Sequence, residues 1–315
     1  MTQIISVDWG TSNFRARLVD TASLQILDEV KASQGVKETF ASWQKKGGDR
    51  EAFFLGFIKT QVRKFNSQIE AHVSVMISGM ASSTIGMKEL PYANLPFDSD
   101  GSTLYVENLG NTDFFGQVKL ISGVRSSFDV IRGEEVQLVG LISEDDKRGT
   151  TVFIFPGTHS KHIICENGIV TDFKTYMTGE LFDVISKQTI LKNSITEASA
   201  SEKELLCFDE GVNCAIGGGS LLNELFKIRA FDLFSSKSKE ENFYYLSGLL
   251  IGDEMNSLKK SNADKINLCA GGALYELYDR SLNQLGLIGK TKVIPKDLVD
   301  TSVVKGQWKV LKSKI

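Results

Sequence analysis

Two short turns in this sequence combine glycine with hydroxyl side chains, a combination that suits phosphate binding. They are Gly10-Thr11-Ser12-Asn13 and Gly157-Thr158-His159-Ser160. Glycine lets a phosphate group come close to the backbone, so that N–H groups and hydroxyls can donate hydrogen bonds to its oxygens. Asp8 precedes the first turn and is suited to hold Mg²⁺ directly or through water. These groups could serve phosphoryl transfer, which needs an anion cradle, a metal ion and a positioned acceptor hydroxyl.

Each turn alone is weak evidence, because a Gly-Thr turn in a β-hairpin is usually structural and Asp8 could simply cap the turn. The stronger observation is that both turns occupy equivalent places in two similar strand–turn–strand units, which favours a nucleotide clamp. The Walker A pattern is absent, so the sequence is not that of a P-loop kinase. The predicted strands are residues 3–9, 13–20 and 24–31 in the first unit, and 150–155, 161–166 and 169–175 in the second.

The remaining pattern predicts an α/β protein of two lobes. A charged stretch that ends in glycine, residues 144–149, is the predicted boundary, so that the lobes are residues 1–145 and 146–315. We expect the last helix to pack back on the first lobe. Apolar spacing predicts helices at 51–65, 130–142, 180–191, 219–228 and 241–259, and further strands at 71–78, 118–121 and 265–269.

Composition excludes several classes of protein. The chain has 315 residues, of which 42% are hydrophobic and 24% charged, as in soluble globular proteins. A formal net charge of -3 gives no sign of nucleic-acid binding, and no apolar run is long enough to span a bilayer. The four cysteines show no CxxC spacing and no export signal is recognised, so we expect reduced thiols and a cytoplasmic location.

Several sequence blocks, in conserved order from residue 4 to about 275, resemble sugar kinases of the actin/hexokinase/Hsp70 superfamily. Residues 8–13 and 156–161 resemble its phosphate motifs, and residues 131–140 are similar to a helix start in glycerol-kinase-like enzymes. With residues 173–181 and 246–254, these blocks resemble the 2-dehydro-3-deoxygalactonokinase family. Residues 270–273 and 300–306 follow the superfamily pattern only loosely, which leaves adenine binding and the last helix less defined.

The resemblance implies a two-lobed actin-like ATPase (ribonuclease H-like) fold with a mixed five-stranded sheet in each lobe. It also implies transfer of phosphate from ATP, with Mg²⁺, to the C6 hydroxyl of 2-dehydro-3-deoxy-D-galactonate. In that case the first lobe holds the sugar acid and the second lobe holds the adenosine. The partners would be these small molecules, and the sequence leaves open whether the chain forms a homodimer.

The resemblance places the general base at Glu134, which would accept the proton of the attacking hydroxyl. Glu134 and Glu135 also lie in the first turn of a predicted helix, where carboxylates are favoured by the helix dipole in any case. Arg132 is a candidate to bind an anionic group of the substrate, or it pairs with a nearby acid.

In the second turn, Thr158, His159 and Lys161 are candidates to contact the γ-phosphate, where Lys161 would neutralise developing charge. His159 and His162 also suggest a zinc site. However, residues three apart on a strand face opposite sides, and no third ligand is close in sequence. Gly271 and Gly272 are candidates to let adenine approach the backbone, although a strand-to-helix turn needs such glycines too.

Substrate contacts are predicted in the first lobe. Ser82 and Ser83 belong to a loop that faces the substrate in the family, and Asn13 lies in the first phosphate turn. A substrate carboxylate needs a cation, for which Arg15 and Lys88 are the candidates. Polar surface residues explain the same pattern equally well.

Three rival interpretations remain at this level. The first is a kinase of the same fold that acts on another sugar or sugar acid, because fold does not fix substrate. The second is a catalytically silent sugar-acid sensor, which intact Asp8, Glu134 and Gly-Thr turns disfavour. The third is an ATPase with a protein partner, which the lack of an obvious peptide-binding domain disfavours.

Overall fold

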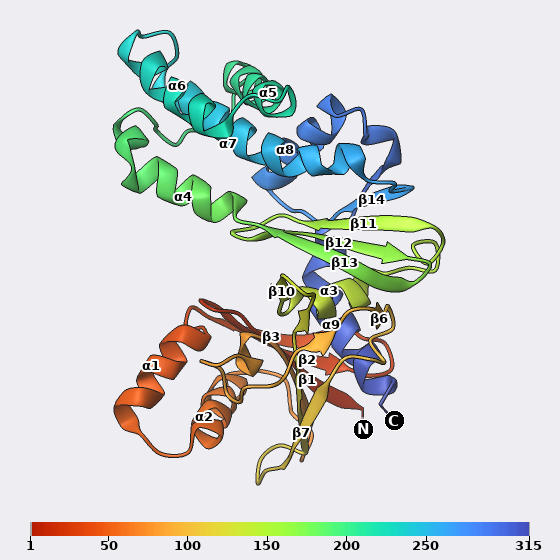
Figure 1. Ribbon diagram of the computed structural model, residues 1–315. Coiled ribbons are helices and arrows are strands. Elements are labelled where there is room, and N and C mark those ends of the chain that lie inside the picture. Colours follow the sequence, from red (N-terminus) through yellow and green to blue (C-terminus); the bar gives the residue numbers. More distant parts are fainter. Residues whose placement is uncertain (1, 315) are drawn as a thin grey trace. The chain divides into compact units, whose positions relative to one another are not determined.

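The computed structural model describes residues 2–314, except for the side chain of Ala273, and the chain divides into two compact units (Figure 1). Unit 1 comprises Met1–Glu144, Gly168–Asp172 and Asp297–Ile315, and unit 2 comprises Asp145–Asn167 and Phe173–Lys296. Relative to a division at residues 145 and 146, two later segments group with the N-terminal unit. One of them holds nearly all of the last helix.

Unit 1 contains a mixed sheet whose strands lie in the order β3-β2-β1-β4-β8-β7. The first three strands form the antiparallel meander that the sequence predicts, and β1 also pairs with β4 in parallel. The central strands β1 and β4 are almost fully buried, as expected for strands with helices on both faces. The strands are β1 (Gln3–Trp9), β2 (Phe14–Asp20), β3 (Ile26–Ala32), β4 (Ser74–Gly79), β7 (Val106–Asn111) and β8 (Gln117–Ile121).

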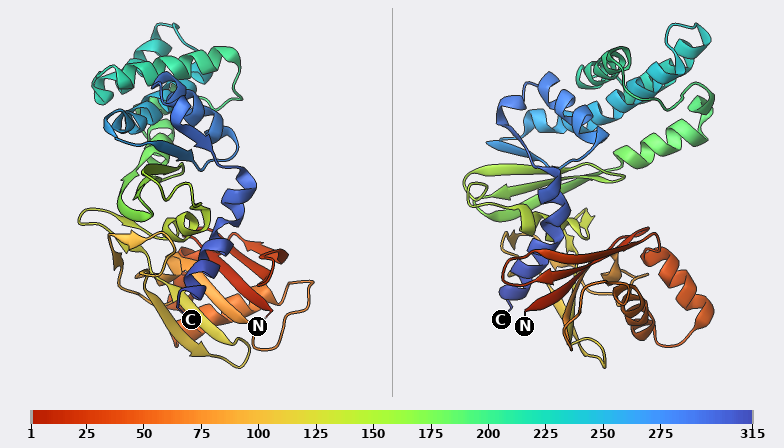
Figure 2. Two further views of the ribbon diagram at one scale, coloured as in Figure 1. Left: turned by 90° about the vertical axis from the view of Figure 1, so that its right-hand side faces the viewer. Right: turned by 180° about the vertical axis from the view of Figure 1, so that it is seen from behind.

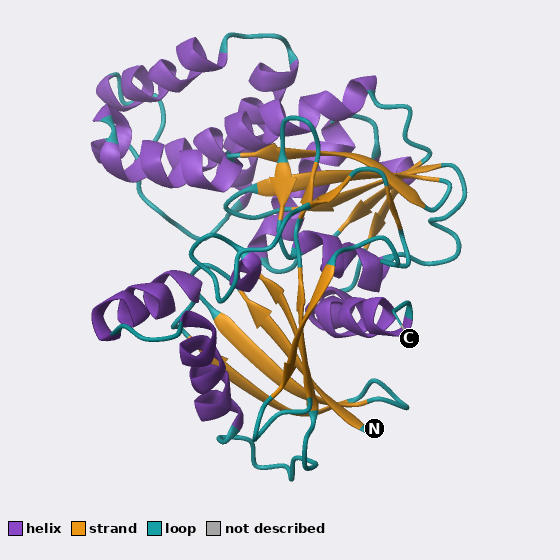
Figure 3. Cartoon of the chain, turned by 60° about the horizontal axis from the view of Figure 1, so that its bottom comes forward, coloured by secondary structure: helices purple, strands orange, loops and turns teal. Residues whose placement is uncertain are grey.

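Helices cover both faces of the unit 1 sheet (Figure 3). α1 (Val36–Lys46) and α2 (Arg50–Val62) lie on one face, where Phe54 and Ile58 of α2 join the main hydrophobic core. α9 (Lys296–Lys312) lies on the other face, where Val304 packs against Ile4 and Val19. Burial on both faces therefore holds β1 in the centre of the unit.

α3 (Glu134–Leu141) crosses α9 at two glycines. A Cβ atom on Gly140 would lie 1.9 Å from the Ser302 carbonyl oxygen, and one on Gly306 would lie 1.9 Å from the Val136 carbonyl oxygen. The two helices could not approach this closely with any larger residue. The predicted start of this helix at residue 130 is wrong, because Gly133, with φ of 111°, separates the helix from a short strand.

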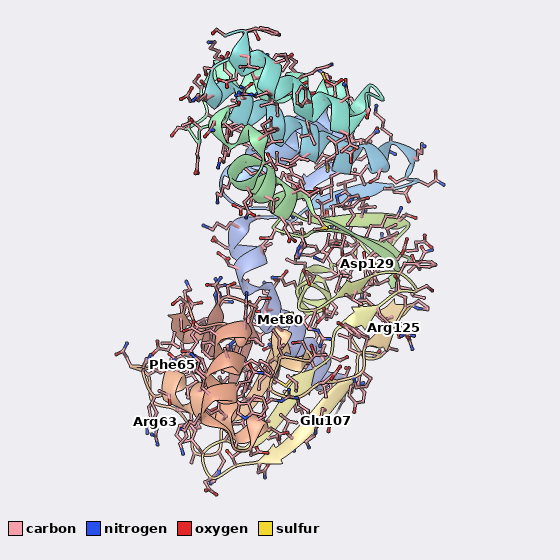
Figure 4. All side chains as sticks on the ribbon, turned by 60° about the vertical axis from the view of Figure 1, so that its left-hand side comes forward. Arg63, Phe65, Met80, Glu107, Arg125 and Asp129 are labelled. Atoms are coloured by element: carbon pink, nitrogen blue, oxygen red, sulfur yellow. The ribbon has the colours of Figure 1, made fainter. Side chains whose placement is uncertain are left out.

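Besides β7 and β8, residues 79–131 of unit 1 form several short elements. They are η1 (Met80–Ser82), β5 (Ala93–Asn94), β6 (Phe97–Asp98), β9 (Val124–Arg125) and β10 (Val130–Ile131). The strands β10, β9 and β5 form a small sheet. Figure 4 labels Met80 at the start of η1, and Arg125 and Asp129 on either side of the turn between β9 and β10.

Unit 2 repeats the order of the first meander. Strand β11 is antiparallel to β12 and parallel to β14, as β1 is to β2 and β4, so the predicted internal repeat is confirmed. The hairpin turn at Asn167 and Gly168 has positive φ at both residues, as the Asn-Gly pair predicts. The strands are β11 (Thr150–Phe155), β12 (Ser160–Glu166), β13 (Ile169–Tyr176), β14 (Lys265–Leu268) and β15 (Thr291–Val293).

The predicted five-stranded sheet in each lobe is wrong, because the described residues form sheets of six, three and six strands. The sheet of unit 1 gains β7, which pairs with β8. The second six-stranded sheet has β6 at its edge, paired with Ile169 and Val170 of β13, two residues that belong to unit 1. Neither β6 nor β7 has the apolar alternation of a strand, so only the pairing partner makes them strands.

Helices α5 to α8 lie on one side of the sheet of unit 2 (Figures 1 and 2). α7 is the central helix, and a Cβ atom on its Gly248 would lie 2.1 Å from the Phe208 carbonyl oxygen of α5. The helices are α4 (Thr178–Gln188), α5 (Glu202–Ile216), α6 (Leu221–Leu233), α7 (Lys239–Asn256) and α8 (Ala273–Gln284), with η2 (Ile190–Asn193), η3 (Ser257–Lys260) and η4 (Ile288–Lys290).

Two global expectations can be compared with the structure. Within the described residues, no helix combines the length and the apolar character needed to cross a membrane. The cysteines Cys165, Cys207, Cys214 and Cys269 are all free thiols, and Cys214 is the least buried of the four.

Candidate active site

The first glycine turn is fixed to the following helix. The Gly10 N–H donates to the Asn13 carbonyl at 2.9 Å, which closes the turn, and the Val36 N–H of α1 donates to the Gly10 carbonyl at 3.0 Å. Gly35 lies against the turn so closely that a Cβ atom would be 2.3 Å from the Thr11 carbonyl oxygen. The backbone of the turn is therefore held by the start of α1, while the side chains of Thr11, Ser12 and Asn13 are exposed.

Asp8 lies near the carboxyl end of β1 and lines a cavity of about 510 Å³ in unit 1, together with Gly10, Asn13 and Arg15. Burial raises the pKa of Asp8. The positive charges of Arg15 and Arg17 oppose this rise, and the charge of Glu134 adds to it. The structure thus brings the predicted Mg²⁺ ligand Asp8 close to both Arg15 and the predicted base Glu134. Among the described residues, no group of three or more His, Cys, Asp or Glu could hold a metal ion.

The two cations proposed for a substrate carboxylate have different surroundings. Arg15 lines the cavity beside Asp8, and its Nε lies 3.9 Å from a carboxylate oxygen of Glu29. Lys88 instead donates to Glu107 at 2.9 Å (Glu107 is labelled in Figure 4) and does not line that cavity. The geometry therefore favours Arg15 of the two.

Glu134 and Glu135 begin α3 and differ in burial. The Glu135 side chain is fully buried, and both of its carboxylate oxygens accept from the Gly133 N–H, at 2.9 and 2.7 Å. Burial, reinforced by the charge of Glu134, raises the pKa of Glu135 to about 8. Glu134 is half-buried and accepts from the Arg132 N–H at 3.1 Å. Only Glu134 therefore has solvent access with which to meet a substrate hydroxyl.

The predicted substrate residues Arg132, Ser82 and Ser83 contact the protein itself. Arg132 Nη1 donates to Ser82 Oγ at 2.6 Å, and its guanidinium lies 4.3 Å from the centre of the Tyr92 ring. Ser82 is fully buried, and the hydroxyl of the nearly buried Ser83 donates to the Met80 carbonyl at 2.7 Å. Ser82 thus holds Arg132 and Ser83 shapes the loop, while Arg132 itself is half-buried.

Three backbone segments of unit 1 meet at the carboxyl end of β1. Trp9 is paired with Gly79 at the end of the parallel strand β4, and a Cβ atom on Gly79 would lie 2.8 Å from the Trp9 carbonyl oxygen. A Cβ atom on Gly133 would in turn lie 3.5 Å from Gly79 Cα. Ligands of α/β sheets commonly bind at the carboxyl ends of parallel strands, so this edge is the candidate catalytic site of unit 1.

The second glycine turn is also fixed to a following helix. The Glu180 N–H of α4 donates to the Thr158 carbonyl at 3.0 Å, and a Cβ atom on Gly179 would lie 2.7 Å from the Gly157 carbonyl oxygen. Thr158 and His159 are exposed, and His159 pairs with the Glu180 carboxylate. Lys161 is buried, and its Nζ donates to the His159 carbonyl at 2.8 Å, so it supports the turn from β12.

Sequence reasoning assigned no role to Glu254, which lies on α7 in the interior of unit 2. Its carboxylate accepts from Ser160 Oγ at 2.7 Å and from His162 Nε2 at 2.9 Å. It also accepts from the hydroxyls of Thr178 and, at 2.8 Å, Tyr278. The Glu254 side chain therefore connects the second turn and β12 to the start of α4 and to α8.

A cavity of about 580 Å³ lies in unit 2 beside the second turn, from Gly157 and Thr178 to the aromatic side chains of α7 and α8. Ligand cavities commonly have volumes of 300–1,000 Å³ and are largely apolar. The predicted adenosine residues Gly271 and Gly272 are exposed and precede α8, whose later residues line the cavity. The residues that line this cavity could not be predicted from the sequence, because they have the spacing of ordinary buried positions on a helix. They include Phe182, Phe243, Tyr244, Leu250, Ile251, Leu277 and Tyr278.

Comparison with known proteins identifies the family. Residues 8–309 match the family model of 2-keto-3-deoxy-galactonokinase. The chain belongs to this family. The matched range of the 2-keto-3-deoxy-galactonokinase family includes every residue proposed above for catalysis or binding.

Individual members of the family resemble the chain over nearly its whole length. It is 28% identical over 290 residues to 2-dehydro-3-deoxygalactonokinase of Escherichia coli (strain K12), covering 90% of each protein. It is 31% identical over 293 residues to the Rhizobium meliloti (strain 1021) protein named "Probable 2-dehydro-3-deoxygalactonokinase DgoK1", covering 90% of this chain and 89% of the relative. A crystal structure of a protein from Sinorhizobium meliloti assigned as a 2-dehydro-3-deoxygalactonokinase has a TM-score of 0.81, 28% identity and 99% coverage of both chains. The two-lobed α/β fold expected from the sequence is thus confirmed.

Proposed function

We propose that this protein transfers the γ-phosphate of ATP to the C6 hydroxyl of 2-dehydro-3-deoxy-D-galactonate, giving the 6-phosphate and ADP. The observation that carries the proposal is the family match over residues 8–309, which contains two Gly-Thr turns built in the same way. The reaction belongs to the cytoplasmic breakdown of galactonate. Its small-molecule partners are ATP and the sugar acid.

Glu134 is the proposed general base. It would accept the proton of the C6 hydroxyl as that oxygen attacks the γ-phosphate, so that the nucleophile does not build up a positive charge. Its partial exposure and its electrostatic coupling to Asp8 support this role. Glu135 is proposed to be structural, because both of its oxygens face the Gly133 N–H.

The phosphate groups are proposed to bind at the two glycine turns. The exposed hydroxyls of Thr11, Ser12 and Thr158 would donate to phosphate oxygens, with His159 nearby. Lys161 would position the second turn and would not contact the phosphate itself, because its amine already donates to the His159 carbonyl. Asp8 fits Mg²⁺, which commonly binds through one or two carboxylates, water and phosphate and which neutralises charge on the transferred phosphate.

The adenosine of ATP is proposed to occupy the cavity of unit 2. Gly157 lies at one side of this cavity, so a nucleotide with its base among Phe182, Phe243 and Tyr244 would direct its phosphates towards the second turn. Gly271 and Gly272 would let α8 start next to the nucleotide.

The sugar acid is proposed to bind at the cavity of unit 1. Arg15 would pair with the substrate carboxylate and Asn13 would donate to a substrate oxygen, because both line the cavity beside Asp8. Arg132 would contact the substrate from the start of α3, in an orientation set by Ser82 and Tyr92. Ser83 would contribute only to the shape of the loop.

A coupled assay of ADP release tests the proposal. The purified protein is expected to turn over 2-dehydro-3-deoxy-D-galactonate faster than its gluconate epimer, in a reaction that needs Mg²⁺. The Glu134→Gln variant should lose roughly 10²–10⁴-fold in kcat, whereas Glu135→Gln should stay close to the parent enzyme at pH 7. If neither acid supports ADP release, the proposed reaction is rejected. If the gluconate epimer is turned over faster, the proposed substrate is rejected.

A further inference from the structure

Helix α6 of unit 2 carries apolar side chains on two opposite faces. Its inner face packs against α7 and η2 through Leu225 and the fully buried Ile228. Its outer face exposes Leu222 to 81%, Phe226 to 61% and Leu233 to 61%. Phe234, at the end of the helix, is 79% exposed. A surface helix normally has a single apolar face, so the second, outward-facing apolar stripe of α6 is not explained by packing against α7 and η2.

The outer side chains form one continuous stripe. Leu222, Phe226, Ala230 and Leu233 follow each other at spacings of four, four and three residues, which places them on one side of a helix. The neighbouring charges are neutralised within the helix. Glu224 pairs with Lys227 at 2.7 Å and Arg229 pairs with Asp232 at 3.1 Å. A surface with no net charge does not repel an identical copy.

The exposed area fits a dimer contact of standard size. An aromatic side chain can bury roughly 150–250 Å² and a leucine somewhat less, so the exposed parts of Leu222, Phe226, Leu233 and Phe234 provide about 500 Å². A standard interface buries about 800 Å² per partner. Since about 65% of a homodimer interface is apolar, the apolar part is about 520 Å². The largest apolar patch on a soluble monomer is commonly about 300–600 Å² and is often a binding site.

We propose that α6 forms the contact of a two-fold symmetric homodimer, in which the outer stripe packs antiparallel on the same stripe of a second copy. An antiparallel arrangement places Leu222 of one copy against Leu233 of the other, and the large Phe226 against the small Ala230. This alternation of large and small residues makes the stripe complementary to itself, as a two-fold contact requires.

The proposed contact is separate from the candidate nucleotide cavity. No residue of α6 lines that cavity, and α6 lies on the side of α7 that faces away from the sheet of unit 2 (Figure 1). Variants of the stripe should therefore change the oligomeric state without changing ADP release. The inference holds whether or not the proposed substrate is correct.

Light scattering coupled to size-exclusion chromatography of the full chain tests the inference. The parent protein is expected to have twice the mass of the chain, and Phe226→Glu should halve that mass because a charge would be buried in the contact. Leu206→Glu is the matched control, because Leu206 is 58% exposed on α5 outside the stripe, and this variant should remain dimeric.

A second variant distinguishes a specific contact from general stickiness. Ala230→Trp makes the stripe more apolar but fills the space needed by Phe226 of the other copy, so it should also give a monomer. Circular dichroism and ADP release should match the parent protein in all variants. A monomeric parent protein, or a dimer that persists in both Phe226→Glu and Ala230→Trp, would overturn the inference.

Discussion

The glycine turns of the two units have the same backbone construction but a different chemical setting. In each unit a turn joins two antiparallel strands, and the following helix donates a backbone N–H to a carbonyl of the turn. In each, a glycine near the start of that helix, Gly35 or Gly179, leaves room for the turn. The internal repeat thus extends from strand order to individual glycines.

The difference lies in the carboxylate beside each turn. In unit 1 it is Asp8, which belongs to the strand that leads into the turn and lines a cavity. The equivalent residue of unit 2 is the buried Phe155, and the carboxylate comes instead from Glu254 of α7. Burial alone would raise the pKa of Glu254, but His162, Ser160 and Thr178 outweigh it and the pKa is lowered. By contrast, burial prevails at Asp8 and raises its pKa.

This comparison teaches that one backbone arrangement can serve two purposes. Asp8 lines a cavity beside the first turn, which supports the proposal that it takes part in the chemistry. Glu254 already accepts hydrogen bonds from four side chains, so we assign it to positioning. Substitution of each carboxylate by its amide should separate the two assignments.

The largest expected effect is that of Asp8→Asn. Loss of the proposed Mg²⁺ ligand should lower kcat about 10²–10³-fold, as loss of a group that stabilises transition-state charge does elsewhere. The unfolding midpoint in urea should not fall, because burial already disfavours the charged form of Asp8. Steady-state ADP release and urea titration measure the two quantities. Full turnover in this variant would remove Asp8 from the chemistry.

Glu254→Gln should act mainly on stability. An amide offers one acceptor oxygen to four donors, so the free energy of unfolding should fall by about 1–3 kcal/mol. The KM for ATP should rise more than kcat falls, because the second turn and the start of α4 lose their common anchor. Glu254→Asp, which keeps the charge, should recover part of the affinity. A normal unfolding midpoint combined with lost kcat would show that Glu254 resembles Asp8 after all.

Gly35→Ala and Gly179→Ala test the shared construction directly. An added Cβ would lie 2.3 Å from the Thr11 carbonyl oxygen or 2.7 Å from the Gly157 carbonyl oxygen, so the turn must move. We expect the KM for ATP to rise about 10-fold in each variant, because small displacements of binding groups are costly. The control is Gly56→Ala on α2, where an added Cβ would meet no atom within 4 Å. Unequal effects of the two variants would show that only one turn binds phosphate.

The smallest effect on turnover is expected for Glu135→Gln, which should change the pH dependence of stability instead. The pKa of Glu135 is about 8 in the folded protein, against 4.5 for an ordinary Glu. Between these values the folded state holds a proton that the unfolded state has lost, so stability should fall as pH rises. Urea midpoints from pH 5 to pH 8 should fall less steeply in Glu135→Gln than in the parent protein. Equal slopes would contradict the assignment of Glu135 as a buried, protonated carboxyl group.

Much of the fold near the turns could be predicted, because local patterns determine it. A short apolar run was sufficient to predict β1, alternation of apolar and charged residues was sufficient for β2, and the Asn-Gly pair was sufficient for the second hairpin. α1 and α5 escaped prediction, as did the strands β6 and β7. Strand β7 has little apolar alternation and is a strand only because β8 offers it an edge.

The sequence by itself determined the family, the two turns and the residue types beside them, because these depend on neighbours along the chain. Tertiary structure alone decided which carboxylate is accessible. Glu134 and Glu135 are adjacent in sequence, yet only Glu135 is fully buried. It also decided that Glu254 meets Ser160, 94 positions away, and that Gly35 and Gly179 support the turns. Burial and close packing depend on segments that are distant in the chain, so no local pattern contains them.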